Sequence, residues 1–235
     1  MKPSNKILLI FFTILVSINL YAEWSDWQQL IFFSKPLLLT TLSLYFFLAT
    51  QKNPSTFRTS ILGGLIFSIA GDVFLMFVEN DPQSQQYFLF GLGSFLITHL
   101  CYLWAFLKFP SEEKGWLTKR PWVIMLFFLF LVGNMIFLWP DIPEAMRIPV
   151  VVYSMAIISM TMTCLNLANK IPTATFQFLF LGVLLFVLSD NIIALNKFKS
   201  DQLSIPYPRL LIMSFYLLGQ YLICISSIRL NNFLK

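Results

Sequence analysis

The amino-acid sequence predicts an all-α, polytopic membrane protein, a bundle of about eight transmembrane helices in a single domain, residues 1–235. Hydrophobic residues make up 57% of the 235 residues and charged residues only 11%, whereas soluble domains carry about 25% charged residues. The apolar residues also gather in runs of the length that crosses a bilayer as a helix, about 17–25 residues. Composition and run length therefore predict the same class.

Eight apolar runs follow one another along the chain. They cover residues 7–22, 30–48, 58–78, 86–108, 121–139, 148–168, 174–195 and 207–229. Their separators are short and contain turn residues, such as Asn53-Pro54 and Asp81-Pro82. No separator is long enough to form a soluble domain. The first run follows Lys2 and Lys6, so a signal peptide cleaved after Ala22 is an alternative interpretation of it.

The net charge of +5 indicates membrane topology rather than nucleic-acid binding. With eight spans, the N-terminus and the even-numbered loops share one side, and most lysines and arginines fall there. The positive-inside rule then predicts that both termini are cytoplasmic. The low charge of the loops and the basic inner face are typical of a multi-pass protein of a bacterial inner membrane. The oligomeric state is not predicted.

Ionisable residues inside an apolar span are costly and mark functional candidates. Among Asp, Glu, Lys, Arg and His, four lie inside the predicted spans and away from the span ends: Lys35, Asp72, His99 and Asp190. At 1.5 Å per residue, Lys35, Asp72 and Asp190 lie about 8–9 Å below the outer ends of their spans. Tyr153 is predicted at the same level, and Tyr216 and His99 somewhat deeper.

Each of these residues also has a structural interpretation. Lys35 can extend its ammonium group to the outer interface or form a buried ion pair with Asp72. His99 can bond a backbone carbonyl or Thr98. The side chains that can simply bridge helices are Tyr153, Tyr216 and Gln220. One neutralising pair would still leave Asp190 without an obvious cation.

Small residues precede both aspartates and indicate close helix packing. Gly63, Gly64, Ser68 and Gly71 precede Asp72, and Gly182 and Ser189 precede Asp190. This spacing predicts a close contact between the third and the seventh span.

Two carboxylates in an apolar pocket do not both ionise readily, so one tends to keep its proton. That division provides a general acid and an anion. No metal and no cofactor are predicted, because one histidine and three scattered cysteines give no metal-ligand spacing. The alternative function is a proton-coupled lipid or small-solute transporter, which also uses buried carboxylates. A non-catalytic membrane scaffold is a third hypothesis.

The residues around these positions resemble the YhhN family of integral membrane lysoplasmalogenases. G-D-V-F-L around Asp72 and F-V-L-S-D-N-I-I-A-L-N-K-F around Asp190 are similar to its two signatures. Lys35-Pro36, the stretch from Gly91 to Tyr102, and Tyr216 with Gln220 are similar as well. The resemblance runs from about residue 30 to residue 229.

The resemblance implies hydrolysis of the vinyl ether bond of lysoplasmalogens, with Asp72 and Asp190 as the catalytic residues. The products would be a fatty aldehyde and glycerophosphoethanolamine or glycerophosphocholine. We expect Asp190 to be the general acid and Asp72, which we assume lies nearer Lys35, to stay ionised. Residues expected to bind the substrate or position water are Lys35, His99, Tyr153, Asn191, Tyr216 and Gln220. Cations that can bind the phosphate are Lys35, Arg147, Lys197, Lys199 and Arg209.

Overall fold

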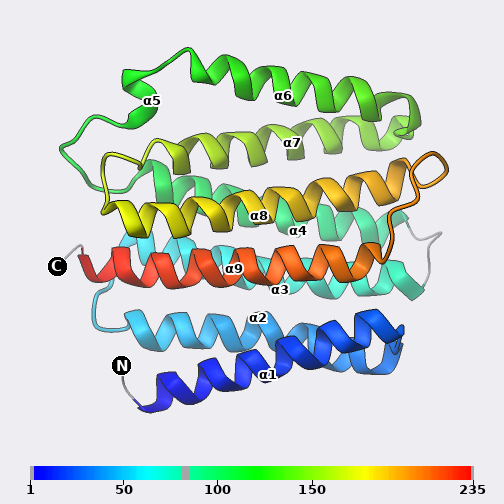
Figure 1. The fold of residues 1–235 in the computed structure, drawn as a ribbon, viewed down its shortest axis with the longest axis horizontal. Coiled ribbons are helices and arrows are strands. Elements are labelled where there is room, and N and C mark those ends of the chain that lie inside the picture. The colour runs from blue at the N-terminus through cyan, green and yellow to red at the C-terminus, as the bar shows by residue number, and fades with distance from the viewer. Residues whose placement is uncertain (1–2, 81–84, 234–235) are drawn as a thin grey trace. The chain divides into compact units, whose positions relative to one another are not determined.

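The structure is a computed structural model that describes residues 3–80 and 85–233, and it is helical along most of that length (Figure 1). Its elements are α1 (Pro3–Ser25), α2 (Gln28–Thr50), α3 (Thr56–Asn80), α4 (Gln85–Leu107), α5 (Trp116–Lys119), α6 (Val123–Leu138), η1 (Trp139–Asp141), α7 (Glu144–Leu165), α8 (Thr173–Phe198) and α9 (Pro208–Phe233). Among the described residues, eight helices are long and apolar enough to cross a membrane. The predicted fold class and span count are confirmed. Lys2 and the predicted turn at Asp81-Pro82 lie outside the described residues.

The chain divides into two compact units. Unit 1 comprises residues 1–105 and 227–235, and unit 2 comprises residues 106–226. The division falls inside α4 and α9, which are each continuous helices. The single domain expected from the sequence stays a prediction.

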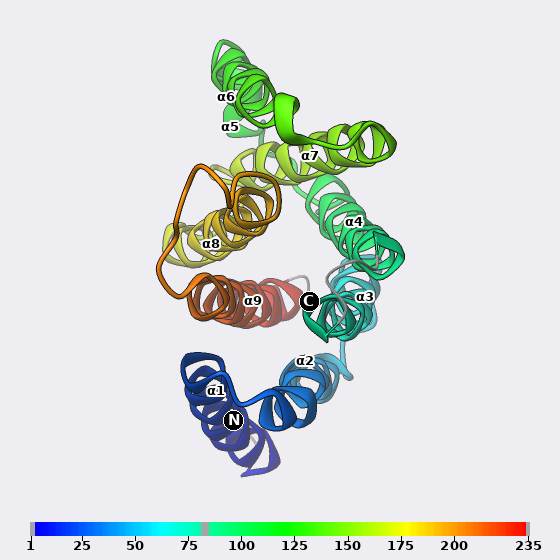
Figure 2. The same ribbon diagram turned by 90° about the vertical axis from the view of Figure 1, so that its right-hand side faces the viewer.

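In unit 1, α1 and α2 lie side by side (Figures 1 and 2). Pro36 lies inside α2, eight residues after the helix begins at Gln28. The polar residues before the predicted apolar run extend the helix towards the N-terminus, so Pro36 lies in its third turn. Proline has no backbone N–H, so it cannot donate to the carbonyl of Phe32 one turn earlier.

Helices α3 and α4 approach each other closely at the glycines of α3. A Cβ atom on Gly71 would lie 2.6 Å from the Phe95 ring, and one on Gly64 would collide with the Tyr102 ring. Beside these contacts, the Thr98 hydroxyl lies 3.1 Å from Ser68 Oγ and donates to the Gly64 carbonyl. The glycines before Asp72 thus receive aromatic rings of α4, and the contact predicted between the third and seventh spans stays a prediction.

The turn between α2 and α3 is joined by hydrogen bonds to the last turns of α9, which also belong to unit 1. Ser55 Oγ donates to Asn231 Oδ1 at 2.6 Å. Asn231 Nδ2 donates to the Asn53 carbonyl at 3.0 Å, and Asn53 Nδ2 donates to Asn232 Oδ1. Ser55 Oγ also accepts the backbone N–H of Arg58 in the first turn of α3. These bonds hold three segments that are far apart in the sequence.

In unit 2, α8 and α9 cross at a pair of glycines. A Cβ atom on Gly182 would lie 2.9 Å from the Gly219 carbonyl, and one on Gly219 would lie 2.8 Å from the Gly182 carbonyl. Ser189 Oγ donates to the Ile212 carbonyl at 3.1 Å along the same pair of helices. The two backbones can approach this closely only because neither glycine has a side chain.

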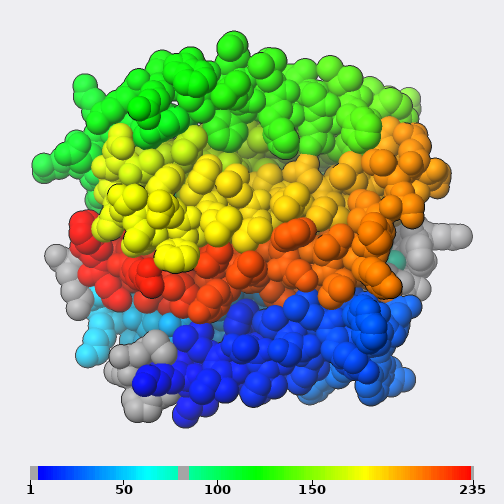
Figure 3. Space-filling model, in the orientation of Figure 1, coloured from blue at the N-terminus to red at the C-terminus, as the bar shows by residue number. Residues whose placement is uncertain are grey.

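Helix α6 packs on α7 and α8 but leaves most of its surface open, and its green atoms are visible along its length in Figure 3. Only 11% of an 18-residue apolar stretch within this span is buried inside the protein. Met125, Phe128, Leu129 and Ile136 are among its exposed apolar side chains. Because this surface carries no charge, it suits contact with lipid chains.

The glycine crossing gives a test of the α8–α9 packing. Gly182→Ala should lower the free energy of unfolding by about 1–3 kcal/mol, because its methyl group meets the backbone of α9. A thermal unfolding scan of the detergent-purified protein measures the change.

Gly133→Ala is the matched control, because a Cβ atom there would meet nothing within 4 Å. In α6 this change should leave the melting temperature unchanged or raise it, since alanine favours a helix over glycine by about 1 kcal/mol. Equal effects of the two substitutions would contradict the close crossing.

Candidate functional site

Buried ionisable side chains identify the candidate site residues. The four predicted from the sequence are all buried: Lys35 (5% exposed), Asp72 (3%), His99 (0%) and Asp190 (7%). Among the described residues, Glu23 and Lys199 are equally buried, although both lie beyond the ends of the apolar runs predicted from the sequence. Burial of Lys35 excludes the alternative in which its ammonium group extends to the interface.

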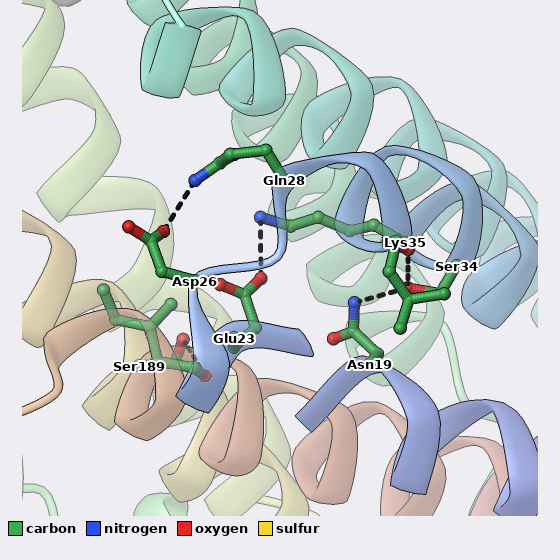
Figure 4. A network of polar contacts seen from close by, with 9 residues as sticks. Asn19, Glu23, Asp26, Gln28, Ser34, Lys35 and Ser189 are labelled. Carbon is green, nitrogen blue, oxygen red and sulfur yellow. Dashed lines mark hydrogen bonds and ion pairs between the residues drawn. The ribbon is translucent and has the colours of Figure 1, made fainter. Parts of the chain in front are cut away.

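Lys35 forms a buried ion pair with Glu23. Its Nζ lies 3.6 Å from Glu23 Oε1, and the two side chains are 6% and 0% exposed. Figure 4 shows the lysine side chain extending from α2 towards the carboxylate on α1. The pair therefore connects the first two helices of unit 1.

Asn19 and Ser34 form a second polar contact between the same helices. Asn19 Nδ2 donates to Ser34 Oγ at 2.9 Å, and both side chains are fully buried (Figure 4). Asn19 Oδ1 is also buried and accepts no hydrogen bond. Because residues four apart share a face of a helix, Asn19 and Glu23 both point from α1 towards α2.

Glu23 was missed because the predicted first span ended at residue 22. In the structure α1 continues to Ser25, so Glu23 lies in the last turn of the helix, and its side chain is buried. The signal that pointed to it is Lys35 itself, since a buried lysine requires a nearby anion. The cleaved signal peptide remains an untested alternative for α1.

Asp72 and His99 lie on α3 and α4 of unit 1. The glycine contacts and the Ser68–Thr98 hydrogen bond hold these two helices together at the level of both residues. Thr98, which was considered as a partner for His99, instead bonds Ser68 and the Gly64 carbonyl. The predicted roles of Asp72 as a catalytic residue and of His99 as a substrate-binding residue stay predictions.

Asp190 and Tyr153 come together in unit 2. The Tyr153 hydroxyl on α7 donates to Asp190 Oδ2 on α8 at 3.1 Å. Both side chains are buried, with exposures of 9% and 7%. The sequence analysis predicted Tyr153 at the same membrane depth as Asp190, and in the structure the two side chains are in contact.

The other predicted residues of unit 2 have partners of their own or are buried. Tyr216 on α9 is buried and packs edge-on against Phe186, with ring centroids 5.4 Å apart. Gln220, one turn later, is fully buried. Asn191 accepts a hydrogen bond from Asn134 of α6 and donates to the Val187 carbonyl. Asn191 thus takes part in a contact between α6 and α8.

Lys199 takes part in a loop contact. Its ammonium group pairs with Asp141 of η1, donates to Gln202 Oε1 at 3.1 Å and lies over the Phe137 ring. Gln202 in turn donates to Asp141. This arrangement joins the segments that follow α6 and α8, and it gives Lys199 a structural role in unit 2.

Arg147 is held in a similar way. Its guanidinium group lies 3.6 Å from Glu144 and stacks over the Trp139 ring. The phosphate-binding roles expected for Arg147, Lys199, Lys197 and Arg209 stay predictions. In the part of the chain that the structure describes, no group of three His, Cys, Asp or Glu side chains is placed to hold a metal ion.

The fold and the buried groups define a class, a multi-pass α-helical membrane protein with ionisable side chains inside its spans. The chain belongs to the YhhN family, whose model matches residues 30–227. This range contains Lys35, Asp72 and Asp190, and it begins after Asn19 and Glu23. The family expected from the sequence is confirmed.

Curated relatives occur in mammals and bacteria. The chain is 36% identical over 174 residues to "Lysoplasmalogenase TMEM86A" of Bos taurus, a match that covers 72% of this chain and 65% of the relative. It is 30% identical over 188 residues to "Lysoplasmalogenase TMEM86B" of Sus scrofa, covering 80% and 72%. It is 28% identical over 155 residues to "Lysoplasmalogenase" of Mycobacterium tuberculosis, covering 63% and 54%. No solved structure matches the chain.

Proposed function

We propose that this chain is a lysoplasmalogenase, an ether hydrolase that cleaves the vinyl ether bond of lysoplasmalogens. The proposed products are a fatty aldehyde and glycerophosphoethanolamine or glycerophosphocholine. Family membership and the names of the relatives support this function and favour it over a transporter. The structural observation that carries the proposal is a buried carboxylate, Asp190, that accepts a tyrosine hydrogen bond among apolar helices.

The reaction requires a proton donor and an anion. Protonation of the outer vinyl carbon gives an oxocarbenium ion, and water then adds to the carbon that is bonded to oxygen. The resulting hemiacetal collapses to an aldehyde and an alcohol. A positioned acid and an anion near the developing cation lower the barrier of the first step. Asp72 and Asp190 are proposed to supply these two functions.

We assign Asp72 as the acid and Asp190 as the carboxylate. Asp190 Oδ2 accepts a hydrogen bond from the Tyr153 hydroxyl, and an acceptor position suits the group that takes a proton from water. The sequence analysis had the opposite assignment because it used Lys35 to keep Asp72 ionised. Lys35 lies 3.6 Å from Glu23, a carboxylate that the sequence analysis did not consider.

The proton balance closes with this assignment. Asp72 gives its proton to the vinyl carbon, and Asp190 takes a proton from the attacking water. When the hemiacetal collapses, Asp190 returns that proton to the glycerol oxygen, and Asp72 takes the proton of the hemiacetal hydroxyl. Both aspartates end in their starting states, so no cofactor is needed.

The remaining polar residues are proposed to hold the substrate. Lys35 is assigned to the phosphate, and the residues assigned to water and the glycerol hydroxyl are His99, Asn191, Tyr216 and Gln220. The lipid chain is proposed to lie among apolar side chains of the spans. Proposed partners are therefore the lysophospholipid and the bilayer.

The protein is an integral membrane protein by its eight apolar helices, and we propose a bacterial inner membrane with both termini in the cytoplasm. In a cysteine-free background, Asp201→Cys in the α8–α9 loop should react with an impermeant maleimide added to intact cells. Lys52→Cys in the α2–α3 turn should react only after lysis. Both positions are exposed, and the reverse labelling pattern would invert the topology.

Asp72→Asn and Asp190→Asn should each lower turnover by about 10²–10⁴-fold, because each removes a group that transfers a proton. Fatty aldehyde release from a lysoplasmalogen by purified protein measures this effect. Asp201→Asn, at an exposed loop position, is the matched control and should retain turnover. Near-normal aldehyde release by a folded Asp72→Asn or Asp190→Asn protein would exclude the proposed roles.

Tyr153→Phe should lower kcat by about tenfold with little change in KM. The change removes the hydrogen bond that holds the Asp190 carboxylate, and Tyr153 is not itself assigned to the substrate. Tyr87→Phe, at an exposed position of α4, should change neither constant. A rise in KM alone would instead support the substrate contact that the sequence analysis expected for Tyr153.

A further inference from the structure

We propose that Glu23 and Asn19 of α1, together with Lys35 of α2, bind the polar head of the lysolipid and select an ethanolamine head over a choline head. This inference rests on the proposed function and adds a head-group site to it. Glu23 and Asn19 lie before the range that the family model matches. Neither residue was among those predicted from the sequence.

The first argument is charge complementarity. Phosphoethanolamine carries one anion and one cation, and the site offers the ammonium group of Lys35 and the carboxylate of Glu23, 3.6 Å apart. Phosphate can take Lys35 while the primary ammonium takes Glu23. One buried ion pair thereby becomes two pairs, so no charge is left uncompensated in the apolar interior.

The second argument is the free acceptor beside the ion pair. Asn19 is fully buried, its Nδ2 is used by Ser34, and its Oδ1 accepts no hydrogen bond. A buried carbonyl oxygen without a donor is costly. A glycerol hydroxyl of the lysolipid is a donor that would satisfy it. Asn19 and Glu23 are one turn apart, about 6 Å along α1, a spacing that suits glycerol at one residue and ammonium at the other.

The third argument is depth within unit 1. Measured along the helices from the α2–α3 turn, Lys35 lies about 22 Å and Asp72 about 24 Å away. Helices α2 and α3 pack together, so the head-group site and the proposed acid lie at nearly the same level. The vinyl ether and the phosphate are joined through one glycerol unit, and a substrate held at Lys35 therefore keeps its ether near the level of Asp72.

The preference for ethanolamine follows from the chemistry of Glu23. A primary ammonium has three N–H donors for the carboxylate, whereas the trimethylammonium of choline has none. Proteins bind such quaternary cations in aromatic cages. A buried carboxylate and amide are better partners for N–H and O–H donors.

The wild-type protein should bind lysophosphatidylethanolamine about tenfold more tightly than lysophosphatidylcholine with the same acyl chain, the value of one charge-assisted hydrogen bond. Isothermal titration of the full-length protein in detergent measures both. These acyl lipids contain no vinyl ether, so the measurement does not depend on turnover. Equal binding of the two lipids would overturn the proposal.

Glu23→Gln should remove the preference by weakening ethanolamine binding about tenfold and leaving choline binding within about twofold. The ratio is taken on one protein preparation, so a general loss of folded protein cancels. Asp26→Asn is the matched control, because Asp26 is an exposed acid of the α1–α2 turn that accepts a hydrogen bond from Gln28 (Figure 4). It should keep the preference. Equal weakening of both lipids by Glu23→Gln would assign Glu23 a purely structural role.

A charge exchange separates binding from folding further. Glu23→Lys combined with Lys35→Glu keeps an ion pair between α1 and α2 but reverses the positions of its charges. If the ion pair is purely structural, the charge-exchanged protein should fold and keep the wild-type preference for the ethanolamine lipid. That result would overturn the proposal. The head-group site predicts a protein with a near-normal melting temperature and no ethanolamine preference. If wild type binds ethanolamine lipid selectively but releases no aldehyde, the hydrolase proposal fails and the head-group site stands.

Discussion

Unit 1 contains two buried charges, on Glu23 and Lys35, that must stay paired for the unit to be stable. An isolated charge in an apolar interior costs several kcal/mol, whereas a close pair recovers much of that cost. Because the two charges come from neighbouring helices, α1 and α2 are held in a fixed register, and the Asn19–Ser34 hydrogen bond reinforces it.

The buried acid Asp190 of unit 2 has a different kind of partner from Glu23 of unit 1. Asp190 receives a hydroxyl donor from Tyr153, and the cation Lys199 is paired with Asp141 in the loops. Glu23 in unit 1 lies beside an ammonium group, whereas Asp190 in unit 2 accepts a hydrogen bond from a neutral hydroxyl.

Much of the fold was predictable, because hydropathy and span length are properties of consecutive residues. The eight spans and the buried state of Lys35, Asp72, His99 and Asp190 followed from them. The partners did not, since a partner depends on which helix faces which. Glu23 lay one residue beyond the predicted end of its span, so an error in one boundary changed a buried acid into a loop residue. The glycines of α3 and α8 correctly indicated close packing, but the aromatic rings of α4 and Gly219 of α9 that receive them were not predictable from spacing alone.

The hydrogen bonds between the α2–α3 turn and Asn231 have a consequence for biosynthesis. Ribosomes deliver the chain to the membrane from its N-terminus, and domains usually fold as their residues emerge. Unit 1 cannot do this completely, because Ser55 and Asn53 find their partner only in the last turns of α9. The hydrogen bonds of Ser55 and Asn53 with Asn231 therefore form only after almost the whole protein has been translated.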